Sequence, residues 1–221
     1  MLQKTRAIVI NHLKYGDSSL IVRAYTEKYG MLSFIAHGIR KKKSILNPYL
    51  FETFSLLMLD LYYKQNRELQ TLKDVQAEII LNHLHYDIRR STIAVFLSEV
   101  IYRSLHEVEA NVNLFNYLNH AIQILDVTDE GIENFHIIFL LQYSKFLGIH
   151  PKNNLELSTY RASGKVQLSH LLEYSLSEIG TFRITSKNRS DLIDQLVRYY
   201  YDHLEGLGEL KSLPVLRTIF H

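Results

Sequence analysis

The chain has 221 residues, 47% hydrophobic and 22% charged, so it can bury the core of one large or two modest domains. It contains no cysteine, which excludes disulfides, thiolate zinc sites and cysteine nucleophiles. Because no stretch has the length and apolarity of a membrane span and the N-terminus lacks a signal-peptide pattern, we expect a cytoplasmic protein.

Positive charge is concentrated in the first third of the chain. Residues 1–82 hold 12 Lys and Arg against 7 Asp and Glu, whereas residues 83–221 hold 13 against 16. Four consecutive cations follow an alternating apolar run: Arg40, Lys41, Lys42 and Lys43. Such a run is often a solvated loop, but it is also typical of a site for a polyanion.

The N-terminal part has the pattern of short β-strands. Alternating β-branched and aromatic residues predict strands at 5–15, 19–26 and 31–37, with turn signals at Gly16 and Gly30. A fourth strand is predicted at 50–63, although its leucine content leaves a helix open, and a fifth at 68–76. Five strands without a crossover helix predict a small closed or nearly closed barrel.

The period changes near residue 77, and the rest of the chain predicts helices. A first helical stretch is expected over 78–106, which we read as two helices meeting near Arg89 and Arg90. Further helices are expected at 114–125, after Asp129, and at 167–179, 190–204 and 213–220, with a surface loop or short hairpin at 152–166. The fold class is therefore α+β with two domains, a barrel over 1–80 and an all-α domain over 81–221.

Motifs that would carry catalysis are missing from the sequence. It has no P-loop, no Gly-x-Gly-x-x-Gly after a strand and no Gly-x-Ser-x-Gly elbow. His106-Glu107 begins like a zinc-protease helix but lacks the second histidine, and His83 and His85 would point apart on a helix. We expect a protein that is not an enzyme and needs no cofactor.

The tyrosines at 199–201 cannot share one helix face, since successive residues are about 100° apart. We expect at least one ring to pack inward and another to lie exposed.

The opening sequence resembles the N-terminal signature of the RecO family of recombination mediators. The similar segments are LQKTRAIVINHLKYGDSSLIV at 2–22 and YTEKYGMLSFIAHGIRK at 25–41. Weaker similarity lies in LQYSKFLGIHP at 141–151 and LEGLGELKSLPVL at 204–216. The resemblance spans the chain, and its specific part is the first 45 residues.

This resemblance implies an OB-fold followed by a helical domain, in a bacterial DNA-repair protein that binds single- and double-stranded DNA. It further implies annealing of complementary strands and assistance to RecA on DNA coated with single-strand-binding protein. The implied partners are RecR and the acidic C-terminal tail of single-strand-binding protein. Many relatives carry a four-cysteine zinc motif after the segment that matches Gly148 to Pro151. This chain has no cysteine there, so we predict no zinc.

Two sets of site residues follow as hypotheses. For phosphate contacts we predict Lys4, Arg6, Lys14, Arg23, Arg40, Lys41, Lys42 and Lys43. For the acidic tail of single-strand-binding protein we predict Arg89, Arg90, Arg103 and Lys145. The alternative function is a non-catalytic adaptor that uses the barrel for protein contacts.

Overall fold

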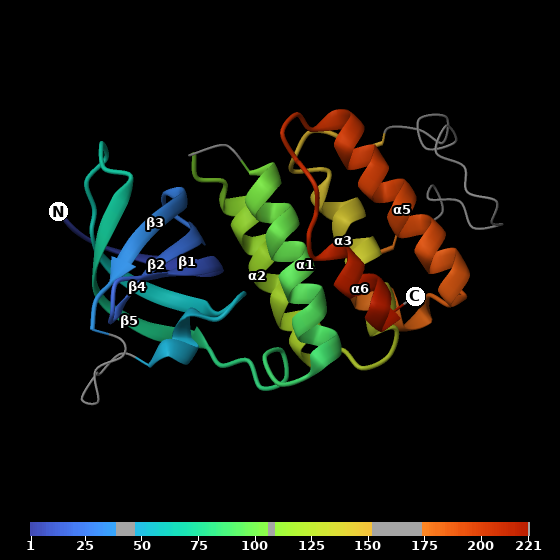
Figure 1. The fold of residues 1–221 in the computed structure, drawn as a ribbon, viewed down its shortest axis with the longest axis horizontal. Helices are drawn as coiled ribbons and strands as arrows, with labels where there is room; N and C mark the ends of the chain where they lie inside the picture. Colours follow the sequence, from blue (N-terminus) through green and yellow to red (C-terminus); the bar gives the residue numbers. More distant parts are fainter. Residues whose placement is uncertain (39–46, 106–108, 152–173, 221) are drawn as a thin grey trace. The chain divides into compact units, whose positions relative to one another are not determined.

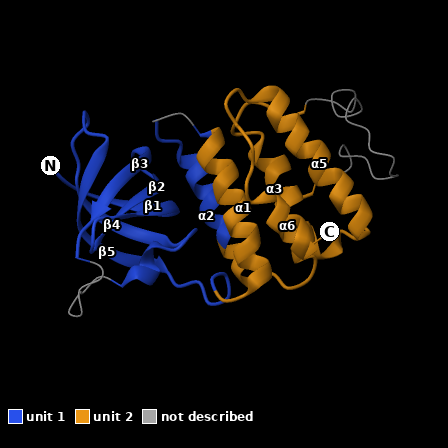
Figure 2. Ribbon diagram, in the orientation of Figure 1, with its two compact units in different colours: residues 1–85, 105–122 blue, residues 86–104, 123–221 orange. Residues whose placement is uncertain are grey.

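A computed structural model describes residues 1–38, 47–105, 109–151 and 174–220 (Figure 1). Two compact units divide the chain, one of residues 1–85 with 105–122 and the other of residues 86–104 with 123–221 (Figure 2). The predicted domain boundary at residue 80 stays a prediction.

The first unit is built on a closed five-stranded barrel with the strand order β1-β2-β3-β5-β4, an OB-type arrangement. Its strands are β1 (Leu2–Tyr15), β2 (Ser19–Thr26), β3 (Gly30–Ala36), β4 (Leu56–Tyr62) and β5 (Leu69–Ile79). All neighbouring strands are antiparallel except β3 and β5, which are parallel. The predicted five-stranded barrel is confirmed.

Alternate side chains of the strands fill the inside of the barrel. The buried cluster takes Ala7 and Val9 from β1, Leu20, Val22 and Ala24 from β2, Phe34 and Ala36 from β3, and Leu57, Leu59 and Leu61 from β4. Because side chains alternate along a strand, the residues between these point to the outside of the barrel. The residues that face the barrel interior therefore determine which residues of each strand lie on its outer surface.

The predicted fourth strand began too early. Residues Pro48–Phe51 form a 3₁₀ helix, η1, and the strand starts only at Leu56. Asn47 accepts a hydrogen bond from the backbone N–H of Tyr49, and Pro48 supplies the fixed φ of a first helical turn. The turn carries Phe51 into the barrel core beside Phe34, at a ring separation of 6.2 Å.

The predicted helix over 78–106 also needs correction. β5 continues to Ile79, residues 80–87 are not helical, and one helix, α1 (Ile88–Ser104), follows. The side chain of Asp87 accepts hydrogen bonds from the backbone N–H groups of Arg89 and Arg90, and so starts the helix there. His85 lies before the helix and contacts the carbonyl of Thr53, at 2.9 Å.

The remaining helices follow the predicted order with shifted ends. They are α2 (Val112–Val127), α3 (Phe135–Tyr143), α5 (Ser186–His203) and α6 (Leu213–Phe220), with 3₁₀ turns η2 (Ile132–Asn134) and η4 (Leu176–Thr181). Thr185 caps α5, five residues before the predicted start at residue 190, because its hydroxyl accepts from Asn188 N–H. Residues 152–173, which include the predicted loop and the start of the helix predicted at 167–179, lie outside the described residues.

The three tyrosines on α5 divide as predicted. Tyr199 and Tyr200 are buried and donate hydrogen bonds to the carbonyls of Ile149 and Leu140, whereas Tyr201 is exposed. The inward rings thus bind the neighbouring segments within the second unit.

Candidate nucleic-acid interface

A β-bulge in β1 decides which side chains this strand presents on the outside. Val9 pairs with Ala24 but Asn11 pairs with Arg23, so Ile10 is an extra residue on the β1 side. The irregularity is held on its other side by two backbone hydrogen bonds, from Phe54 N–H to the Val9 carbonyl at 2.7 Å and from Val9 N–H to the Ser55 carbonyl at 3.0 Å. After the bulge, odd-numbered residues of β1 face outward.

Three cross-strand rows therefore cover the outside of β1, β2 and β3. One row contains Asn11, Arg23 and Ser33, the next contains Leu13, Ile21 and Ile35, and the last contains Tyr15, Ser19 and His37. We call these nine residues the outer β1–β2–β3 face. None of the nine is acidic. In OB-folds, the outside of the second and third strands is the usual surface for oligonucleotides.

Arg23 lies centrally in its row and is half-buried. Its Nε donates to Ser33 Oγ at 3.4 Å, which links Arg23 to the neighbouring strand β3. Of the predicted phosphate contacts, Arg23 is the one that the described strands place on the outer β1–β2–β3 face.

Lys14 lies on the opposite face of the sheet from Arg23. It pairs with Leu20, which in turn pairs with Ala36, and both of those residues belong to the inner cluster. Lys14 is exposed because this row lies at the end of the barrel, one strand residue before the β1–β2 turn. The predicted cations Arg40 to Lys43 lie outside the described residues.

Lys4 and Arg6 lie beside acidic residues. Lys4 pairs in register with Asp60 of β4, which pairs with Asp74 of β5. Arg6 donates to Glu78 at 2.6 Å and to Glu27 at 3.3 Å. Its guanidinium carbon also lies 5.0 Å from the ring centroid of Phe115. These contacts give Arg6 a structural role inside the first unit, and a phosphate would have to compete with two carboxylates for it.

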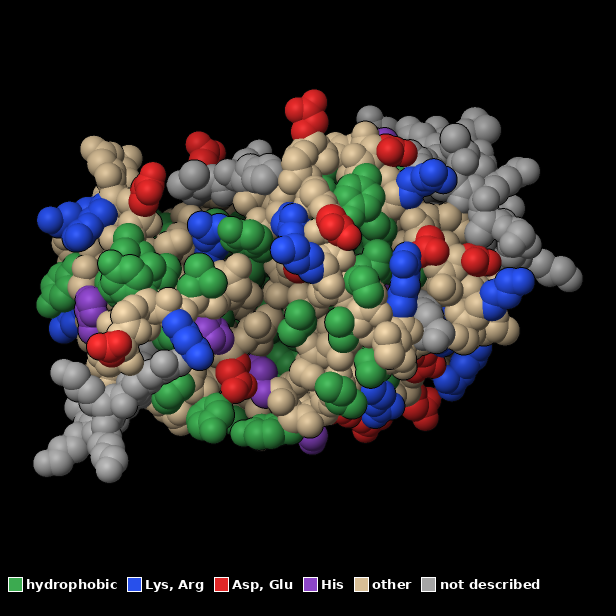
Figure 3. All heavy atoms as spheres, in the orientation of Figure 1, with side chains coloured by type: hydrophobic (Ala, Val, Ile, Leu, Met, Phe, Trp, Pro, Cys, Tyr) green, Lys and Arg blue, Asp and Glu red, His purple; other side chains and the backbone are tan. Residues whose placement is uncertain are grey.

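Two further cations lie in the β4–β5 turn, and the sequence reasoning did not select them. Lys64 and Arg67 are exposed on a turn organised by buried Gln70, whose amide donates to the carbonyls of both residues. The connection between the last two strands of an OB-fold commonly contacts oligonucleotides, and that position was the available signal. In the view of Figure 3 the barrel surface carries hydrophobic side chains interspersed with basic ones and some acidic ones.

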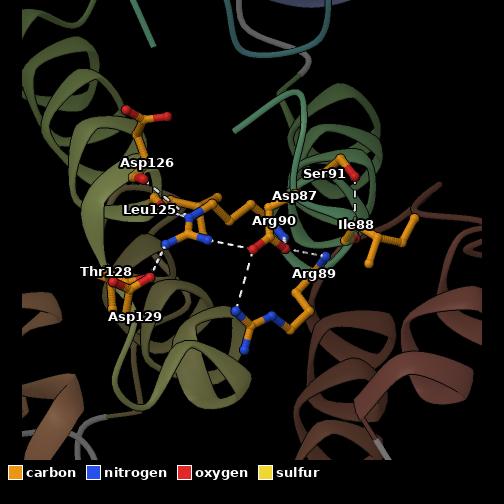
Figure 4. A network of polar contacts seen from close by, with 9 residues as sticks. All are labelled: Asp87, Ile88, Arg89, Arg90, Ser91, Leu125, Asp126, Thr128 and Asp129. Carbon is orange, nitrogen blue, oxygen red and sulfur yellow. Dashed lines mark hydrogen bonds and ion pairs between the residues drawn. The ribbon is translucent and has the colours of Figure 1, made fainter. Parts of the chain in front are cut away.

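Arg90, one of the four predicted cations of the tail site, is buried and has a structural role. The side chain is 4% exposed and joins the start of α1 to the end of α2 within the second unit (Figure 4). Nε donates to the carbonyls of Leu125 and Asp126, and Nη2 donates to the carbonyl of Thr128. These carbonyls at the helix end have no intrahelical partner, so Arg90 caps α2.

Two carboxylates complete the Arg90 network. Asp87 accepts from Nη1 and Asp129 accepts from Nη2, each at 2.6 Å. Desolvation acts to raise the pKa of Asp87, but hydrogen bonds from Arg89 and Arg90 outweigh it and hold that pKa below its ordinary value. To bind a peptide, this guanidinium would have to give up some of the five acceptors that the chain itself supplies.

The other three predicted tail-binding cations differ in accessibility. Arg103 is half-buried and donates to Glu99 at 3.0 Å and to the Leu207 carbonyl at 3.3 Å. Arg89 and Lys145 are exposed, each with one side-chain contact, to Asp87 and Gln142 respectively. Arg89 and Lys145 are therefore the accessible members of this set.

Within the described ranges, no three His, Asp or Glu side chains group in a way that could hold a metal ion. Over the same part of the chain, no helix has the length and apolarity needed to cross a membrane. Neither finding bears on residues 39–46, 106–108, 152–173 or 221.

The fold and the outer β1–β2–β3 face define a two-part protein in which an OB-fold barrel precedes a helical region. Two family models match it, Recombination protein O N terminal over residues 1–80 and Recombination protein O C terminal over residues 85–161. The chain belongs to the RecO family, whose general role lies in DNA repair and recombination.

Similar curated relatives cover nearly the whole chain. The DNA repair protein RecO of Azobacteroides pseudotrichonymphae is 31% identical over all of both chains. The proteins of the same name from Flavobacterium psychrophilum and Phocaeicola vulgatus are each 33% identical, covering 98% and 100% of both chains respectively. The resemblance found in the opening sequence is confirmed.

Proposed function

We propose that this protein binds and anneals single-stranded DNA and helps RecA to load onto DNA coated with single-strand-binding protein, acting by binding rather than by catalysis. The observation that carries the proposal is the outer β1–β2–β3 face, where an OB-fold presents Arg23 among nine residues with no carboxylate. A surface that binds a polyanion must avoid fixed negative charge, and this part of the barrel does so.

Phosphate contacts are assigned by the proposal to Arg23 and Lys14, and to the cations Arg40 to Lys43 on the strength of their sequence. Lys4 and Arg6 lie beside Asp60, Glu27 and Glu78, so we rank them below the others. The β4–β5 turn adds Lys64 and Arg67.

The experiment measures the affinity for a labelled oligonucleotide by fluorescence anisotropy over a series of salt concentrations. Each phosphate contact with a single strand contributes about 0.7 to the slope of log affinity against log salt. The variant with Arg40, Lys41, Lys42 and Lys43 all changed to Ala is expected to bind more weakly and to lose up to about 3 from that slope.

Lys187→Ala, which removes an exposed cation from α5, is the matched control and should leave the slope unchanged. An unchanged slope in the quadruple variant would remove Arg40 to Lys43 from the interface. If the unmodified protein binds no oligonucleotide at any salt concentration, the adaptor function replaces the proposal. An annealing time course with complementary coated strands tests the mediator step separately.

Partners in the proposal are RecR, RecA indirectly, and the acidic tail of single-strand-binding protein. For that tail the accessible cations Arg89 and Lys145 are the preferred contacts, because Arg90 is enclosed by acceptors and Arg103 is held by Glu99 and Leu207. The four residues stay predictions for this contact, with Arg89 and Lys145 ranked first.

A further inference from the structure

Two large apolar side chains on the outer β1–β2–β3 face are unusually open to solvent. Leu13 is 67% exposed and Tyr15 is 54% exposed, although both lie within a paired β-strand. The bulge at Ile10 places them there, since regular alternation from inward-facing Val9 through Ile10 would put His12 and Lys14 on the outer side. The bulge in β1 therefore places two apolar side chains on the outer face.

The apolar surface is graded across the sheet. In the row of Leu13, exposure to solvent increases from β3 to β1. Ile35 is buried, Ile21 is half-buried and Leu13 is exposed. Tyr15 lies two residues along β1 from Leu13, a spacing of about 6.7 Å along a strand. A ring and an aliphatic side chain at this spacing on one face of a strand can together serve as a platform for flat groups.

The charges around Leu13 and Tyr15 indicate which kind of ligand this platform would bind. Arg23 lies in the adjacent row, and Lys14 lies between Leu13 and Tyr15 in sequence on the other face at the barrel end. Among the described residues that adjoin the two apolar side chains along β1 and in its turn, Asp17 is the one carboxylate. The faces of nucleic-acid bases are apolar and flat, and phosphates lie near them along the strand. These faces are accessible only when the strand is unpaired.

We infer that Leu13 and Tyr15 form a base-stacking platform that makes the barrel prefer unpaired nucleic acid over duplex. The inference rests on the proposed DNA-binding function and names the residues that read bases, as distinct from those that contact phosphates. Stacking is tolerant of base identity because every base has a π-face, so the platform selects strandedness and not sequence.

The first experiment compares Leu13→Ala/Tyr15→Ala with the unmodified protein on three probes of equal length. These are an oligothymidine, the same backbone without bases, and a duplex. The double variant is expected to bind oligothymidine about 5- to 150-fold more weakly, with an unchanged salt slope and unchanged affinity for the other two probes. Tyr15→Phe, which keeps the ring, should bind oligothymidine as tightly as the unmodified protein.

Tyr62→Ala is the matched control, because Tyr62 is a tyrosine of similar exposure, 48%, on the outside of β4. It should bind oligothymidine as tightly as the unmodified protein. Equal losses on all three probes, or no loss on oligothymidine, would overturn the inference. Failure of the unmodified protein to bind oligothymidine at all would instead contradict the proposed function.

A second measurement does not depend on truncating the platform. The chain contains no tryptophan, so Tyr15→Trp introduces a single indole fluorophore. Its emission is expected to be quenched when oligothymidine binds and to stay constant with the base-free backbone, because only stacked bases contact the ring. Tyr62→Trp should show no quenching. Quenching that is equal at positions 15 and 62 would contradict the platform.

Discussion

Arg90 shows at the scale of one residue how burial changes the meaning of a charge. A cation beside the start of a helix was a reasonable contact for an acidic peptide, yet its five acceptors are all supplied by the chain itself. The Asp129 carboxylate is 83% exposed, so most of the benefit comes from Asp87 and the carbonyls at the end of α2.

Arg90→Ala is expected to lower the free energy of unfolding by about 3–5 kcal/mol, since it leaves buried carbonyls and a carboxylate without their donor. Urea denaturation followed by circular dichroism measures this. Arg89→Ala, which removes the exposed neighbouring cation, should change the free energy by less than about 0.5 kcal/mol. A loss below about 1 kcal/mol in Arg90→Ala would show that the network contributes little.

The exposure of Leu13 and Tyr15 could not be predicted from the sequence alone. The rings of the N-terminal part could be named from the sequence, but which of them reach solvent depends on Ile10 being an extra residue. No local pattern of β-branched residues marks that bulge, because it is fixed by the backbone of Phe54 and Ser55 from a distant part of the chain.

At the scale of elements, α6 is held at its start by a carboxylate from α1. Glu99 accepts hydrogen bonds from the backbone N–H groups of Lys211 and Ser212 and from the Ser212 hydroxyl, at 2.6–3.0 Å. Desolvation acts to raise the pKa of Glu99, but these bonds and the one from Arg103 outweigh it and keep the pKa below its ordinary value.

A carboxylate whose pKa is lowered by folding stabilises the fold above its unfolded pKa, about 4.3, and that stabilisation disappears as the pH falls through the folded pKa. Glu99→Gln is therefore expected to lower the free energy of unfolding by about 1–3 kcal/mol at pH 7. The difference from the unmodified protein should shrink below about pH 4.3 and vanish once the folded-state carboxyl is protonated.

Urea titrations between pH 7 and pH 3 measure this difference. Glu209→Gln, which removes an exposed carboxylate from the connection before α6, is the control and should leave the free energy of unfolding unchanged. A difference for Glu99→Gln that stays constant across the whole pH range would show that its charge does not hold α6.

Element positions were predictable where the pattern was long and locally capped. The strand at 19–26 and the helix at 213–220 have the predicted bounds, because turn residues and a proline mark their ends. The prediction that 78–87 are helical was wrong. The apolar residues there have a helical period, but the residue that starts the helix is Asp87, at the end of this segment.

At the scale of the whole molecule, the family resemblance supplied what the patterns could not. Strand alternation alone indicates a barrel, and the RecO match adds its place in recombination and repair. The distribution of the cations could not be predicted from the sequence, because it is the strand register that places Lys4 beside Asp60 and Arg23 between Asn11 and Ser33.

The tail of single-strand-binding protein provides a prediction at this scale. Titration calorimetry with the acidic tail peptide is expected to show Arg89→Ala and Lys145→Ala each binding about 1.5- to 5-fold more weakly, as for exposed ion pairs. Lys187→Ala serves as the control. Wild-type affinity in both variants would place the tail contact elsewhere.

The bulge in β1 also affects how relatives of this chain should be compared. Along this strand one extra residue exchanges inside and outside, so positions 2–9 and 11–15 follow opposite parities. A relative with the same number of residues but no bulge would turn its counterparts of Leu13 and Tyr15 toward the barrel interior, whereas a relative that lacks the extra residue would keep them outside. For this segment, the exposure of a tyrosine depends on the residue count and the bulge together, and not on the residue type alone.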